Sequence, residues 1–114
     1  MTTVQDAVTP NSEPLIGRVK WFNNKAGYGF ITVTNDSSEF PSVKGTDVFV
    51  HHTSIEVENQ QYKYLVQGEY VEFILNHTTT GDHEYQASNV HGIASGKLMC
   101  ETRREFKLAR SAYK

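Results

Sequence analysis

The sequence has few of the features that are typical of secreted or membrane proteins. Cys100 is its only cysteine, so the chain cannot form an internal disulfide. Its N-terminus has no hydrophobic run, which argues against a signal peptide and against a membrane-spanning helix. We therefore expect an intracellular protein with no membrane partner, located in the cytoplasm or, as an alternative, in the nucleus.

Residues for catalysis or metal binding do not occur in the required patterns. A zinc site combines several cysteines and histidines at short spacings, and the five histidines here follow none of these spacings. The sequence also has neither a nucleophile–base signature nor a phosphate-binding glycine loop. We expect no catalytic residue, no metal, no cofactor and no small-molecule substrate.

The chain also lacks an overall positive charge, since its formal net charge is −2. Residues 16–96 carry five Lys or Arg against nine Asp or Glu, a net charge of −4. Residues 97–114 carry six Lys or Arg against two Glu, a net charge of +4. A body with this charge cannot rely on release of counterions from phosphates to bind nucleic acid. Any such binding by the body has to come mainly from stacking.

Aromatic residues are concentrated near the only tryptophan, Trp21. In a strand, successive side chains point to opposite faces. Tyr28 and Phe30 therefore share one face, and Gly29 and Ile31 share the other. Because Ile31 suits an interior, the two aromatic rings are predicted to lie outside, where exposed aromatic pairs usually indicate a binding surface.

A second segment, residues 47–51, repeats this arrangement. Val48 and Val50 alternate with Phe49 and His51, which predicts a buried β-branched face and an outer face of flat rings. Two such strands side by side would form a surface on which nucleobases can stack. Stacking of this kind contributes about 1–3 kcal/mol per base and depends little on base identity.

These segments resemble a cold-shock domain, the family of bacterial cold-shock proteins and eukaryotic Y-box proteins. The resemblance covers residues 16–92, with the motifs in the family's order. Its motifs are Gly17-Arg18-Val19-Lys20-Trp21-Phe22-Asn23, Gly27-Tyr28-Gly29-Phe30-Ile31, Asp47-Val48-Phe49-Val50-His51, Tyr62-Lys63-Tyr64-Leu65, Gly68, Val71-Glu72-Phe73 and Ala87-Ser88-Asn89-Val90.

The chain order supports an all-β fold, with five strands expected near residues 16–22, 27–34, 47–51, 70–78 and 84–93. We expect a small five-stranded antiparallel barrel of the oligonucleotide-binding (OB) type. Three regions are expected: a disordered N-terminal arm (1–15), the cold-shock domain (16–93) and a basic C-terminal extension (94–114). Phe40, in an insertion relative to compact bacterial members, is interpreted either as a cap over the barrel edge or as a further stacking ring.

The resemblance implies a protein that binds single-stranded RNA or DNA with little sequence specificity and acts as an RNA chaperone or as a regulator of transcription or translation. The alternative is a protein-interaction barrel whose aromatic face binds a partner protein. The nucleic-acid-binding residues that we expect are Lys20, Trp21, Phe22, Lys25, Tyr28, Phe30, Phe49, His51, His52, Tyr62 and Lys63. The choice between RNA and DNA, the target sequences and the oligomeric state stay open.

The C-terminal extension allows two interpretations. Met99, Phe106 and Tyr113 recur every seven residues, so a helix would place them along one stripe that could pack on the barrel. Alternatively, the extension is a mobile arm that binds phosphates. Its candidate phosphate contacts are Arg103, Arg104, Lys107 and Arg110.

Overall fold

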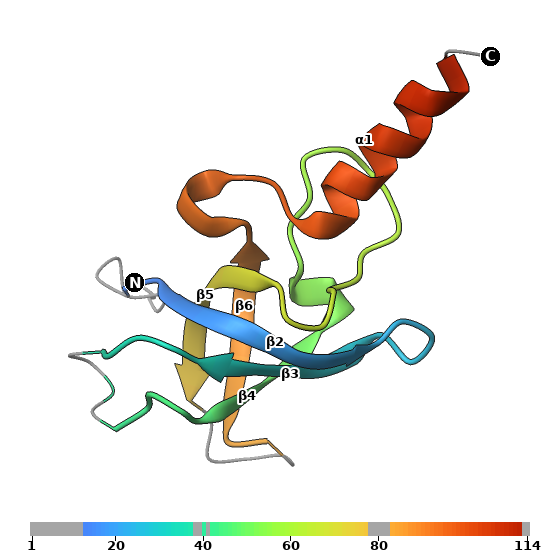
Figure 1. Ribbon diagram of the computed structural model, residues 1–114. Coiled ribbons are helices and arrows are strands. Elements are labelled where there is room, and N and C mark those ends of the chain that lie inside the picture. The colour runs from blue at the N-terminus through green and yellow to red at the C-terminus, as the bar shows by residue number, and fades with distance from the viewer. Residues whose placement is uncertain (1–12, 38–39, 41, 78–82, 113–114) are drawn as a thin grey trace, which may run out of the picture.

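The computed structural model describes residues 13–37, 40, 42–77 and 83–112 (Figure 1). It contains five strands, two short 3-10 turns and one helix in the described part of the chain. In chain order these are β2 (Leu15–Asn23), β3 (Tyr28–Val33), β4 (Asp47–His51), η1 (His52–Ser54), β5 (Tyr70–His77), β6 (Tyr85–His91), η2 (Ile93–Ser95) and α1 (Met99–Ala112). Every predicted strand is present, within one or two residues of its expected bounds.

The strands close into a barrel in the order β2-β3-β4-β6-β5, which confirms the predicted OB-type architecture. One detail of that prediction is wrong, because the barrel is not antiparallel throughout. β4 and β6 run parallel and pair at Phe49 and Gln86. Strand directions cannot alternate around a closed ring of five strands, so at least one neighbouring pair has to be parallel.

The barrel also begins one residue earlier than expected. Leu15, assigned to the N-terminal arm from the sequence, is the first residue of β2, where it pairs with Phe73 of β5. Its side chain is buried in the core. The rest of the predicted arm, apart from residues 13 and 14, lies outside the described residues.

The core has the alternation that the sequence predicted. Ile31, Val48 and Val50 are fully buried, while Tyr28 and Phe49 point away from them. Phe40 packs partly buried against the core, as a cap over the barrel edge would.

An irregularity in β2 changes the side-chain pattern around the tryptophan. Val19 pairs with Ile31 and Trp21 pairs with Phe30, so Lys20 has no partner in the register and forms a β-bulge. As a result Lys20 and Trp21 both face outward, although they are consecutive. Without the bulge, strict alternation would turn Trp21 toward the core together with Val19.

The extension forms the predicted helix, but the expected stripe does not pack on the barrel. Met99 is exposed, and Phe106 keeps 69% of its surface accessible. Tyr113 lies outside the described residues. Figure 1 shows why: α1 points away from the barrel, so only its beginning meets the rest of the protein. The buried residues there are Leu98, Cys100 and Glu101, which lie next to the exposed Met99.

No helix among the described residues is both long enough and apolar enough to span a membrane.

Candidate nucleic-acid interface

Four aromatic rings from three strands form one continuous outer surface, which we call the aromatic platform: Trp21, Tyr28, Phe30 and Phe49. The ring centroids of Trp21 and Phe30 are 5.4 Å apart, and those of Phe30 and Phe49 are 5.8 Å apart. Tyr28 lies 5.9 Å from both Trp21 and Phe49. The sequence predicted all four as binding residues, and the structure brings them together.

The strand register is what assembles the platform. Phe30 of β3 lies between Trp21 of β2 and Phe49 of β4, because it pairs with both. Three of the contacts are edge-to-face, the geometry that aromatic quadrupoles favour. They are those of Trp21 with Tyr28, of Trp21 with Phe30, and of Phe30 with Phe49. Trp21 and Tyr28 keep 39% and 38% of their surface accessible, so a flat ligand can reach them.

Two histidines continue the surface at the end of β4 and the start of η1. His51 pairs with Tyr28 in the register, and its ring lies 4.4 Å from that of His52. The backbone N–H of His52 donates to the carbonyl of Gly27 at 2.8 Å. Gly27 has a φ of +81°, and a Cβ there would come within 2.6 Å of the His52 ring. A glycine is therefore needed for the turn and for this ring to lie against it.

His83 is a platform neighbour that the sequence analysis missed. Its ring stacks on Phe49 with a centroid separation of 4.2 Å and an interplanar angle of 3°, and it meets Phe30 edge-on at 5.5 Å. His83 precedes β6 and is far from Phe49 in sequence. Only the closure of the barrel by the β4–β6 pair brings the two together, so no local pattern could have indicated this contact.

Two of the predicted binding residues lie elsewhere. The ring of Phe22 packs partly buried against the core, because the bulge at Lys20 turns Phe22 inward and Trp21 outward. Tyr62 is 63% exposed and its ring neighbours Tyr64 at 6.1 Å, rather than any ring of the platform. Tyr62 comes from the long connection between η1 and β5, which runs beside α1 (Figure 1).

The predicted lysines differ in how free their charge is. The Lys20 ammonium donates to a carboxylate oxygen of Asp47 at 2.7 Å, and the Thr32 hydroxyl donates to the other at 2.7 Å. The bond with Lys20 is the main cause that lowers the pKa of Asp47. A phosphate has to compete with Asp47 for Lys20. Lys25 and Lys63 form no ion pair within 4.0 Å among the described residues.

Three of the four cations predicted in the extension share one groove. Arg103, Arg104 and Lys107 of α1 line it together with Tyr62. Arg110 lies further along the helix and does not line it.

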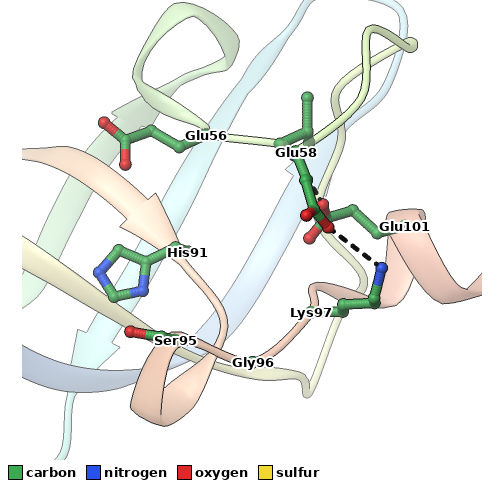
Figure 2. Close-up of a pocket in the computed structure, with 8 residues that line it drawn as sticks. Glu56, Glu58, His91, Ser95, Gly96, Lys97 and Glu101 are labelled. Carbon is green, nitrogen blue, oxygen red and sulfur yellow. Dashed lines mark hydrogen bonds and ion pairs between the residues drawn. The ribbon is translucent and has the colours of Figure 1, made fainter.

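A second cavity, shown in Figure 2, is poorly suited to phosphates. It is lined by Glu56, Glu58 and Glu101 together with His91 and Lys97. Its charged groups already have partners: Lys97 donates to Glu58 at 3.3 Å, Glu101 accepts from the Glu58 backbone N–H at 2.9 Å, and Glu56 accepts from the Asn89 amide at 2.6 Å. In the described part of the chain, no three metal-ligating side chains are arranged to hold an ion.

Comparison with known proteins relates most of the chain to one family. The family model described as 'Cold-shock' DNA-binding domain matches residues 15–93. Cold shock protein CspD of Bacillus subtilis is 45% identical over 74 residues, which is 65% of this chain and 91% of that protein. Cold shock protein CspB of Bacillus caldolyticus is 43% identical over 74 residues, again 65% of this chain and 91% of that protein. Cold shock protein CspV of Vibrio cholerae is 42% identical over 79 residues, or 69% of this chain and 94% of that protein. The family match ends before α1.

Proposed function

Since the chain belongs to the cold-shock domain family and is thus a nucleic-acid-binding protein without enzymatic activity, we propose that it binds single-stranded RNA or DNA with little sequence specificity. In this proposal, successive bases stack on the aromatic platform and on His51. The ligand strand is bound through its bases, whose faces are exposed only when it is unpaired.

The single observation that carries the proposal is the continuous platform over a rigid core. Three of its four rings lie on β3 and β4, whose opposite faces are buried, so the surface is preformed there and little ordering is needed on binding. Each stacked base contributes about 1–3 kcal/mol whatever its identity. This suits a body with a net charge of −4, in which attraction between lysines and phosphates is limited.

Three lysines of the barrel and its connections are proposed to neutralise phosphates of the bound strand. Lys25 lies in the turn between β2 and β3, where its own N–H and that of Ala26 are held by the Asn23 side chain. Lys63 lies in the connection between η1 and β5. Lys20 can take part only by exchanging Asp47 for a phosphate.

The cellular role that we propose is that of an RNA chaperone or of a regulator of transcription or translation, acting in the cytoplasm. A protein that binds only the unpaired state shifts the pairing equilibrium by mass action, without any chemical step. Weak hairpins would therefore open when the protein is in excess.

Fluorescence of Trp21, the only tryptophan, tests the proposal directly. Oligouridine should quench it, and duplex DNA of the same length should not, because paired bases cannot stack on the platform. Phe30→Ala should weaken oligouridine binding by about 1–3 kcal/mol. Phe106→Ala is the matched control, since it removes an exposed phenylalanine ring away from the platform. Equal quenching by duplex would contradict the stacking mechanism.

The protein-interaction barrel is a second candidate, since aromatic residues are also enriched in protein interfaces and the net negative charge of the body limits its attraction for phosphates. Titration with homopolymers separates the two functions. A surface that binds only protein would leave the Trp21 signal unchanged with every oligonucleotide.

A further inference from the structure

We propose that the groove between residues 61–64 and α1 is a second binding subsite for the same strand, and this inference depends on the proposed function. In this groove, Tyr62 stacks one base beyond those on the platform. Arg103, Arg104 and Lys107 bind the adjoining phosphates.

The lining of the groove combines the two kinds of side chain that bind single strands. Its residues are Gln61, Tyr62, Tyr64, Cys100, Arg103, Arg104 and Lys107. Its volume is about 350 Å³, within the roughly 300–1,000 Å³ typical of ligand sites. Tyr62 is largely exposed, whereas Cys100 is buried, so the phenol ring is reachable above a closed floor. Stacking rings beside a cationic wall are how proteins bind single strands without sequence preference.

The positive charge of the groove is not neutralised from within. Among the described residues, no carboxylate lines it. Arg103, Arg104 and Lys107 form no ion pair within 4.0 Å in the described part of the chain, in contrast to Lys97, which pairs with Glu58 and Glu105. Partial burial raises the pKa of the Glu69 carboxyl, and the charge of Arg103, at longer range, opposes that rise. The groove therefore offers cations that an incoming phosphate can bind without breaking an ion pair.

Several hydrogen bonds hold α1 in position beside the connection that carries Tyr62. One carboxylate oxygen of Glu101 accepts from the Leu98 N–H at 2.8 Å, and the other accepts from the Glu58 N–H at 2.9 Å. The Gln61 amide donates to the Cys100 carbonyl at 3.0 Å. These bonds fix both walls of the groove relative to each other, so its cations are preorganised rather than carried on a mobile arm.

The chain path connects the groove to the platform. β4 ends at His51, the η1 turn follows, and the connection then runs alongside α1 (Figure 1), where Tyr62 lines the groove. In the proposed arrangement, the bound strand leaves the platform past His51 and continues into the groove. Because the family match ends at residue 93, the cationic wall is an addition of this chain to the matched domain.

The test uses the full chain and two oligouridines, of about five and about twelve nucleotides, since one OB barrel binds about 4–16 nucleotides. Arg104→Ala and Tyr62→Ala should each weaken binding of the longer oligonucleotide by about fivefold or more. Binding of the shorter one should change less than about twofold. Arg104→Ala should also flatten the salt dependence of log affinity by about 0.7, the value for one phosphate on a single strand.

Arg110→Ala is the matched control, because it removes one cation from the same helix outside the groove. It should alter binding of the longer oligonucleotide less than about twofold. The proposed subsite would be refuted if Arg104→Ala and Arg110→Ala had equal effects. It would also be refuted if Tyr62→Ala bound the longer oligonucleotide with unchanged affinity. In that case Trp21 quenching of the wild type would still support the platform, whereas its absence would refute the proposed function itself. Thermal melting of each variant checks that the fold is intact.

Discussion

Replacing His83 with alanine tests whether the platform is partly occupied by the protein's own ring. His83 lies parallel to Phe49 at 4.2 Å, in the arrangement that a stacked base would adopt. A base that binds this face of Phe49 first has to displace the imidazole. We therefore expect His83→Ala to bind single strands more tightly than the wild type.

The size of the effect follows from the contact that is lost in the free protein. A stacked aromatic pair contributes about 0.5–1.5 kcal/mol beyond the area that it buries. Removing that competitor should return the same free energy to the ligand, which corresponds to affinity about two- to twelvefold higher. A larger gain would exceed what the displacement of one ring can explain.

Quenching of Trp21 by an oligouridine of about five nucleotides, short enough to report on the platform alone, provides the assay. The control is a double-mutant cycle with Phe49→Ala, because without the Phe49 ring the His83 substitution should have no effect. Weaker binding of His83→Ala would refute the reasoning and would show that the imidazole contacts the strand. A gain that persisted in the Phe49→Ala background would also refute the reasoning, because the effect would then not come from the stack on Phe49.

Two further predictions concern residues around the site. Asp47→Asn should release Lys20 from its ion pair while keeping an acceptor for Thr32. Binding of single strands at low salt should therefore tighten, and the dependence of log affinity on log salt concentration should steepen by about 0.7. An unchanged slope would mean that Lys20 does not reach a phosphate. Leu98→Ala should destabilise the protein in urea by about 2–5 kcal/mol, because this side chain is fully buried where α1 joins the barrel. Leu98→Ala should also speed thiol labelling of Cys100, because burial raises the pKa of this thiol in the wild type. The control is Leu108→Ala, at an exposed position of the same helix, which should change neither stability nor labelling. Equal effects of the two substitutions would show that α1 is not anchored through Leu98.

The sequence by itself determined the barrel and most of its aromatic surface. Alternation along residues 28–31 and 47–51 placed Tyr28, Phe30 and Phe49 outside, over a buried aliphatic face, and the structure confirms this placement. The reason is local, since the pleat of a strand sends neighbouring side chains to opposite faces wherever the strand lies. The helical composition of the extension was equally readable.

Only the tertiary structure decided which other residues join that surface. The bulge at Lys20 turns Trp21 outward and Phe22 inward, and the parallel β4–β6 pair brings His83 onto Phe49. Tyr62, expected among the stacking rings, lies instead beside α1. Each of these outcomes depends on register or on contacts between segments far apart in the chain. A periodic pattern specifies the faces of one element, but it carries no information about where the next element will meet them.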